Sequence, residues 1–330
     1  MKTLQTKHGD VLFLFHKLQY DFKKELPLAI GPDVYLDMTP QDVLDEASRL
    51  LEDNSICPAF CLTSYGGIMN LCLRNPAGKI LSPKFNSSNL FFLSITSLRL
   101  RAPLEINAMM QLKLGVREKL IESSELFPLM STYNPDVYAS YSSEDIHICE
   151  EITKRQIHID EGEFKRLLSA LVLFSQVTCG LSKSFQMSYL VLFVALESLF
   201  LSKEDYSKAK ILASRVAKFL AKFNFFLPCE NPKKAVILKE WLENEYANGR
   251  NDLVHGIQDV ALSTKCRKRQ AQAFGLLHEI TRLCILGFLS LENDKLALHS
   301  NSSGNQLQRW LDSLDPATGR FLKDQRMWCD

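Results

Sequence analysis

Apolar residues recur every three or four positions through the second half of the chain, and this spacing predicts a series of amphipathic helices. Within 206–223, for example, Ile211, Val216 and Leu220 mark one face, whereas Lys210 lies on a polar face. The other helices predicted here cover 146–157, 160–179, 184–201, 232–248 and 264–291. We therefore expect the second half to fold as an all-α bundle.

The first half mixes strand and helix patterns. Two apolar runs, 59–65 and 68–74, flank Gly66-Gly67, which is typical of a hairpin. Thr39 and Pro40 are favourable at a helix start and predict an amphipathic helix to about Leu51. The remaining elements are strands over 11–15 and 34–38, a helix over 86–98 and a loop-like segment over 124–142.

These patterns predict three parts of the chain. Residues 1–150 are expected to form a mixed α+β domain, and 151–295 an all-α helical domain. Residues 296–330 read as a polar C-terminal tail with a short helix around 306–314. The boundary between the two domains falls near 142–160.

Composition places the chain among globular proteins, with 46% hydrophobic and 23% charged residues. The net charge of +1, with a slight excess of Lys and Arg in the second half, lacks the basic footprint of a dedicated nucleic-acid-binding domain. Nine cysteines without regular spacing indicate reduced thiols. Cys57 and Cys61 have no second pair to complete a zinc site, so no metal and no cofactor is predicted.

The longest apolar run, Tyr189 to Leu201, is interrupted by Glu197 and is shorter than the roughly 20 residues that a membrane helix needs. It is better explained as a buried helix. With no apolar leader segment near Met1, we expect a cytoplasmic protein without membrane contact.

The candidate chemistry lies at Arg250 and His255. Gly249 is expected to end the helix before them, because glycine is favoured just past a helix end. Arginine offers phosphate a permanent planar cation, and histidine exchanges a proton near neutral pH. A ribonuclease that works without metal needs both properties: proton transfer at the 2′-hydroxyl or leaving oxygen, and neutralisation of transition-state charge.

The five-residue spacing of this pair affects its geometry. On one ideal helix, Arg250 and His255 would diverge by roughly 140°. The length of the arginine side chain, a bend at Gly249, or a symmetric dimer that sets two such segments opposite each other would bring the groups together.

At these residues the chain resembles HEPN domains, whose R-x4-6-H motif Arg250 and His255 match, with Asn251 as the polar residue after the arginine. The helix around Glu197 resembles the A-x-E-x-L helix of the ApeA-like HEPN branch, and 208–217 resembles the helix that follows it there. The resemblance spans about 185–291, a third of the chain.

This resemblance implies a helical bundle that homodimerises and joins its R-x4-6-H segments in a cleft. It implies metal-independent RNA cleavage that leaves a 2′,3′-cyclic phosphate, in antiviral defence or a toxin-like system. Carried over by position, Arg250 binds the scissile phosphate, His255 is the acid or base, Asn251 orients the phosphate or the histidine, and Glu197 is the family's helix carboxylate, a candidate partner of Arg250. ApeA-like members carry an N-terminal β-containing region, which suits 1–150.

Each candidate also has a structural explanation. Arg250 and His255 would serve as a salt bridge and cap at a helix junction, and Glu197 would pair with Arg215 or Arg250, because a buried carboxylate needs a partner. Asn251 would form a turn. A basic run is explained either as a solvated helix start or as an RNA-backbone contact beside the cleft; its members are Lys265, Arg267, Lys268 and Arg269.

Three functional hypotheses follow. The first is a metal-independent endoribonuclease that acts on RNA, with tRNA among the candidate substrates. The second is a non-catalytic module that binds RNA or a protein partner, which the near-neutral charge also fits. In the third, the N-terminal half senses a phage-derived trigger or inhibitor protein and keeps the nuclease silent.

Overall fold

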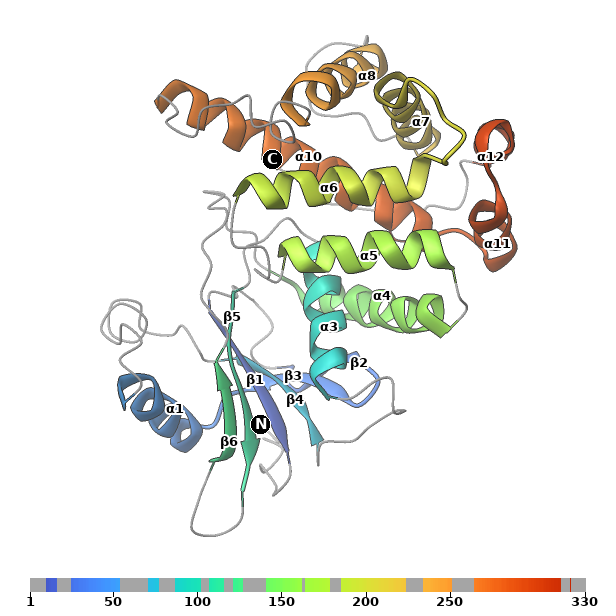
Figure 1. Cartoon of the computed structure of the whole chain (residues 1–330). Coiled ribbons are helices and arrows are strands. Elements are labelled where there is room, and N and C mark those ends of the chain that lie inside the picture. Colours follow the sequence, from blue (N-terminus) through green and yellow to red (C-terminus); the bar gives the residue numbers. More distant parts are fainter. Residues whose placement is uncertain are drawn as a thin grey trace. The chain divides into compact units, whose positions relative to one another are not determined.

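The computed structural model of the chain describes residues 10–16, 25–53, 71–76, 87–101, 107–115, 121–126, 141–161, 164–178, 185–223, 234–250, 264–315 and 321. The chain divides into two compact units, Met1–Arg155 and Gln156–Asp330, and the division falls inside one helix, α4 (Ser143–Glu161). The first unit holds a small antiparallel sheet and the second is helical (Figure 1). The coarse layout expected from the sequence, α+β followed by helices, is therefore present.

The sheet of the first unit has the strand order β2-β3-β4-β1-β5-β6, with every neighbouring pair antiparallel. Its strands are β1 (Val11–His16), β2 (Leu28–Gly31), β3 (Val34–Met38), β4 (Leu71–Asn75), β5 (Asn107–Leu114) and β6 (Ile121–Leu126). Two of these, β1 and β3, confirm the strands predicted at 11–15 and 34–38. The residues 59–65 of the predicted hairpin lie outside the described residues, as do Cys57 and Cys61.

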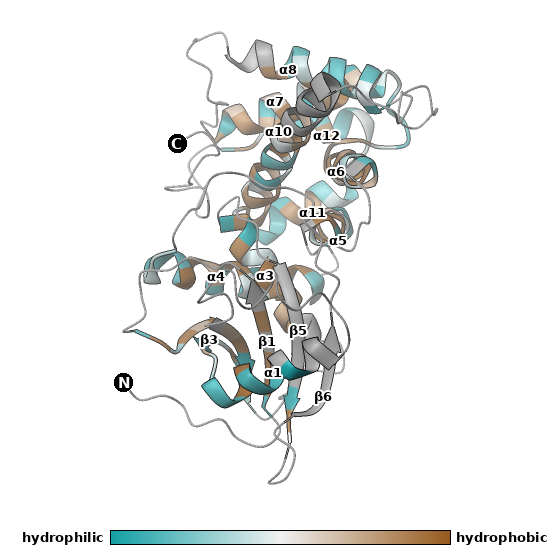
Figure 2. Ribbon diagram, turned by 90° about the vertical axis from the view of Figure 1, so that its left-hand side faces the viewer, coloured by the Kyte–Doolittle hydropathy of each residue, from teal (hydrophilic) through white to brown (hydrophobic). Residues whose placement is uncertain are grey.

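Helices α1 (Gln41–Asp53) and α3 (Ser87–Arg101) complete the first unit with the start of α4. Figure 2 shows brown, apolar residues along β1 and β3 and teal, polar residues along α1. Helix α3 packs on β2 and β3, and its Phe91 and Ile95 are buried. A buried guanidinium, Arg74, lies between two carboxylates, 2.6 Å from Asp10 and 3.3 Å from Asp37.

The second unit is built around α6 (Phe185–Phe200), which packs against α5, α7, α10 and the π-helical turn η2. The surrounding elements are α5 (Lys165–Thr178), α7 (Lys208–Lys222), α8 (Lys234–Asn244), η2 (Glu245–Arg250), α10 (Thr264–Leu289), α11 (Asn293–Asn301) and α12 (Gly304–Asp312). Phe200, Phe219 and Phe288 meet in the core with ring centroids 4.5 to 5.5 Å apart. Apolar packing on several sides explains why α6 has the most continuous apolar sequence of the chain.

Within the described ranges, no single helix has both the length and the apolar composition to cross a bilayer; α10 and α11 satisfy that test only as a pair, bent by 118°.

The helix predicted to start at Asp160 instead starts at Lys165. Asp160 belongs to the last turns of α4, which ends at Glu161. Asp160 and Glu163 have the three-residue spacing of a capping box, but the apolar spacing of α4, with buried Ile152 and Ile159, continues through Asp160. Burial of that face outweighs the local capping preference.

The carboxyl end of α6 is capped by side chains from three other helices. Arg166 of α5 donates to the carbonyls of Ser198 (3.4 Å) and Leu201 (2.8 Å). The carbonyls between them are bonded by His299 Nε2, which donates to Leu199 O at 2.7 Å, and by Arg215 Nη1, which donates to Phe200 O at 2.6 Å. A helix leaves its last four carbonyls without intrahelical partners, and a cation at this end is also attracted by the negative end of the helix dipole. This end of α6 is therefore fixed in place.

The short helix predicted around 306–314 is confirmed as α12, but the described part of the segment after residue 295 is not only a polar tail. The segment holds two helices, the end of α11 and all of α12, and it buries Leu296, Leu307, Trp310 and Leu311. Its backbone also joins the cap of α6, because Arg166 donates to Ser302 O at 2.9 Å and Arg215 donates to Gly304 O at 2.9 Å. Each helix has only nine residues and a few apolar positions, so the polar composition of the segment gave no indication of the buried face.

His299 is expected to make the second unit sensitive to mild acid. Burial lowers the pKa of its imidazole from 6.5 to about 3, because the ring lies against Phe288 and Trp310 and cannot be solvated as a cation. The unfolded chain thus binds a proton more readily than the folded one, and stability falls as the pH drops below 6.5. Between pH 6.5 and 5 we expect the free energy of unfolding to fall by about 1.5 kcal/mol.

Denaturant unfolding of the wild type and of His299→Gln at several pH values measures this effect. Glutamine keeps an N–H donor for Leu199 O but does not titrate. The variant should lose the pH-dependent part of the change in that range; identical slopes for the two proteins would show that His299 does not carry it.

Candidate functional site

Two of the four residues proposed for catalysis lie within the described part of the chain. Glu197 belongs to α6, and Arg250 is the last residue of η2. Asn251 and His255 lie outside the described residues. The four basic residues at 265–269 lie in the first turns of α10, where the structure describes the backbone and not the side chains.

The chain stays helical up to Arg250, in contrast to the expected helix end at Gly249. After α8 it continues in the π-helical turn η2, and Gly249 lies inside this turn without a positive φ. The reason for glycine here is space. A Cβ on Gly249 would lie 2.7 Å from both Glu245 Oε1 and the Tyr189 hydroxyl. The π turn has one more residue per hydrogen-bonded ring than an α-helix, and such turns are frequent at functional sites.

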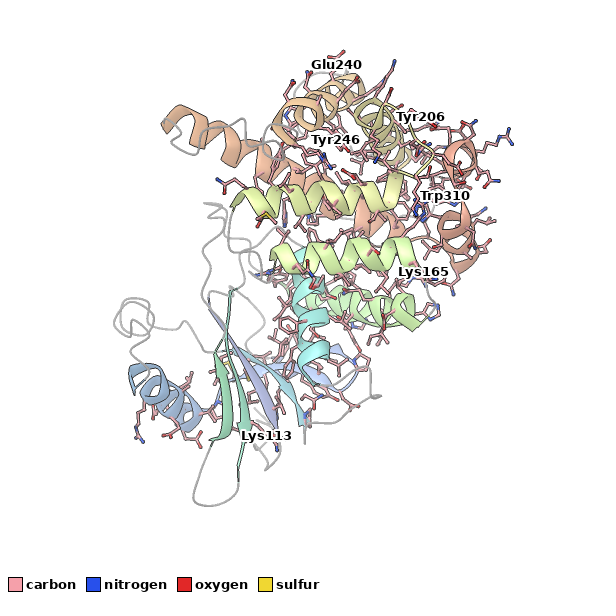
Figure 3. The ribbon with its side chains drawn as sticks, viewed as in Figure 1. Lys113, Lys165, Tyr206, Glu240, Tyr246 and Trp310 are labelled. Atoms are coloured by element: carbon pink, nitrogen blue, oxygen red, sulfur yellow. The ribbon has the colours of Figure 1, made fainter. Side chains whose placement is uncertain are left out.

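Arg250 is held by α6 and by its own turn. Its Nη2 lies 3.1 Å from Glu197 Oε1, and its guanidinium carbon lies 4.8 Å from the centre of the Tyr246 ring. The Tyr246 hydroxyl donates a hydrogen bond of 2.9 Å to the same Oε1 atom of Glu197. Figure 3 labels Tyr246 where the turn meets α6. Arginine, carboxylate and phenol thus form one connected group, called here the Arg250 cluster.

The pairing of Glu197 that the sequence left open is resolved in favour of Arg250. The other candidate, Arg215, pairs instead with Asp205 through two hydrogen bonds of 2.8 and 3.0 Å. Both members of that second pair are buried, and they belong to the capped end of α6. The side chains of Glu197 and Arg250 are 19% and 24% exposed, so they remain in reach of solvent and of a ligand.

A second phenol–carboxylate bond joins the same two elements in the opposite direction. Tyr189 of α6 donates to Glu245 of η2 at 2.7 Å, whereas Tyr246 of η2 donates to Glu197 of α6. Between the two tyrosines, Phe193 packs edge-on against both, with ring centroids 5.1 and 5.4 Å away. The π turn is therefore fastened to α6 at two points, with a continuous aromatic contact between them.

Burial and the neighbouring Glu197 carboxylate raise the pKa of Tyr246 well above its ordinary value of 10. Its phenol thus keeps its proton at neutral pH and can serve as the hydrogen-bond donor that the Glu197 carboxylate requires. The Tyr246 phenol is therefore a neutral donor within the Arg250 cluster across the physiological pH range.

Chemically, the described part of the site has a cation that suits an anionic ligand, and it has no cluster of side chains that would bind a metal ion. No group of three or more His, Cys, Asp and Glu side chains gathers at metal-binding positions within the described ranges. Arg250 pairs with Glu197, and a second carboxylate, Glu245, belongs to the same π turn, so the described side chains of the site are not collectively basic.

Sequence reasoning missed the roles of Tyr246, Tyr189 and Glu245. Tyr246 is buried, as an aromatic side chain in the core would be, but its hydroxyl reaches the Glu197 carboxylate. A usable signal was present: Tyr189, Phe193 and Glu197 follow each other at four-residue intervals and share one face of α6.

Comparison of the chain with protein-family models, with curated proteins and with solved structures gives no match.

Proposed function

We propose that the chain is a metal-independent endoribonuclease of HEPN type. The observation that carries the proposal is the Arg250 cluster. A guanidinium is held by Glu197 and Tyr246 at the residue immediately before the segment that contains Asn251 and His255. A cation fixed at that position has the charge and the planar fork suited to a phosphodiester.

In the proposed reaction, the 2′-hydroxyl of the ribose attacks the adjacent phosphorus and the bond to the 5′-oxygen breaks. The 2′-hydroxyl loses its proton and the leaving 5′-oxygen gains one, and the products are a 2′,3′-cyclic phosphate and a 5′-hydroxyl. His255 takes part in one of these proton transfers, Arg250 neutralises charge on the phosphorane-like transition state, and Asn251 orients the phosphate or the histidine.

The assembly that we propose is a homodimer with the two 250–255 segments facing each other in a cleft. His255 lies five positions after Arg250, and a symmetric pair of segments lets each chain complete the other's site. We place this activity in the cytoplasm, in antiviral defence or a toxin-like system. The first unit then acts as the sensor of a phage-derived trigger or inhibitor.

A second candidate is a non-catalytic module that binds RNA or a protein. The charge of the site favours it, because Glu197 pairs with Arg250 and a second carboxylate, Glu245, belongs to the same π turn. Strong RNA binding requires several cations near the backbone. In the ribonuclease proposal these come from 265–269 and from the partner chain.

Incubation of the purified protein with labelled tRNA and mixed RNA in EDTA separates the two candidates. The ribonuclease proposal expects cleavage at an unchanged rate in EDTA, with 2′,3′-cyclic phosphate ends on the products. A well-folded sample that binds RNA saturably without cutting it would favour the binding module.

A further inference from the structure

We propose that Tyr246 is a positioning residue that sets the orientation of the Arg250 guanidinium towards a phosphodiester; this inference rests on the proposed function. Tyr246 acts at two points of the same cluster. Its hydroxyl donates to Glu197 Oε1, and its ring face lies under the guanidinium.

The first contact fixes the carboxylate. Glu197 Oε1 accepts from Tyr246 at 2.9 Å and lies 3.1 Å from Arg250 Nη2, so a single oxygen connects phenol and guanidinium. Because the raised pKa of Tyr246 keeps the phenol protonated, the donor is present at every pH at which the nuclease would work. The glutamate side chain is thereby restricted to a rotamer in which Oε1 faces Arg250.

The second contact fixes the plane of the cation. A guanidinium over an aromatic face is attracted by the ring quadrupole, and here the distance to the ring centre is 4.8 Å. A carboxylate oxygen at one edge and a ring at one face leave the guanidinium fewer orientations than either contact alone. An arginine that is 24% exposed would otherwise sample many rotamers.

The backbone position of Tyr246 is fixed independently of this cluster. Tyr189, Glu245 and Phe193 hold the π turn on α6, and α6 is itself capped at its carboxyl end. The orientation of Arg250 is therefore set by contacts with the core of the second unit and does not depend on the ligand. Transition-state stabilisation by a fixed charge requires this kind of preorganisation.

The chain offers a matched control for the test. Tyr246→Phe and Tyr189→Phe each remove one phenol–carboxylate hydrogen bond between α6 and η2, and both keep the aromatic ring. A purely structural role of Tyr246 predicts equal effects of the two substitutions on every measured property. A positioning role predicts that only Tyr246→Phe alters the chemistry at Arg250.

Two measurements on the full chain decide between these predictions. In steady-state RNA cleavage, Tyr246→Phe should lower kcat by about tenfold, the usual effect of losing a hydrogen bond to a charged group, with KM changed by less than about twofold. Tyr189→Phe removes one contact that fastens the π turn but none within the Arg250 cluster, and its ring keeps the packing on Phe193, so kcat should fall by less than about twofold. In a second measurement, the reaction of Arg250 with phenylglyoxal, followed by peptide mass spectrometry, should be several-fold faster in Tyr246→Phe than in the wild type or in Tyr189→Phe.

Equal values for the two variants in both measurements, with equal thermal midpoints, would overturn the positioning role while leaving the ribonuclease intact. Absence of cleavage by the wild type would refute the proposed function. The phenylglyoxal comparison would then still support or refute the control of Arg250 by Tyr246, because it requires no RNA.

Discussion

Arg250→Ala is expected to lower the rate of RNA cleavage by about 100- to 1000-fold, the range found when a preorganised charge or donor is removed from a transition state. The variant also leaves the Glu197 carboxylate with Tyr246 as its hydrogen-bond donor but without its cation. RNA would then meet an uncompensated negative charge where it now meets an ion pair. The salt dependence of RNA affinity should therefore become shallower, with a slope smaller by about one.

Arg250→Lys tests whether charge alone suffices. Lysine keeps the charge but lacks the planar fork that contacts Glu197 and lies over the Tyr246 ring, so we expect most of the loss in rate to remain. Lys210→Ala, which removes an exposed cation from the first turn of α7, serves as the control and should cleave normally. Wild-type cleavage by Arg250→Ala would exclude Arg250 from the chemistry.

The second large effect concerns the fold: a chain that ends at Glu292 is expected not to fold its second unit. The truncation removes α11 and α12, which bury Leu296, Leu307, Trp310 and Leu311. Burial of one large apolar side chain is worth about 1.5 to 3 kcal/mol, so losing four removes as much as a typical domain's whole stability of about 5 to 15 kcal/mol. The same cut removes His299, and with it the donor to Leu199 O.

Circular dichroism and thermal unfolding of the truncated chain measure this loss. A chain that ends at Phe321 keeps both helices and the buried ring of Phe321, whose N–H donates to Ser290 Oγ, and it should unfold cooperatively. If the shorter chain unfolded at the midpoint of the longer one, α11 and α12 would contribute nothing to the unit, against the burial of their side chains.

The parts of the fold that could be predicted are those with strong periodicity. The apolar spacing of α6 and α7 identified both helices to within two residues at each end, because packing on a core requires that spacing. Strands β2, β5 and β6 were missed. β6 forms one edge of the sheet and has the polar sequence Ile-Glu-Ser-Ser-Glu-Leu, and edge strands often carry such residues.

For the site, the sequence indicated the pairing of Glu197 with Arg250 but left Arg215 as an equal choice. Only the tertiary structure separates them, because Arg215 is used by Asp205 and by the end of α6. The π turn could not be predicted, since the residues of η2 also fit an α-helix followed by a glycine stop. The role of Tyr246 depends on that turn and could not be predicted for the same reason.

RNA cleavage in EDTA by His255→Ala, measured beside the wild type, tests the proposed metal-independent ribonuclease most directly. We expect the variant to be folded and dimeric, to bind RNA, and not to cut it. It should also lose any toxic or protective effect in cells. Full cleavage by a well-folded His255→Ala protein would show that His255 takes no part in the reaction and that the proposed mechanism is wrong.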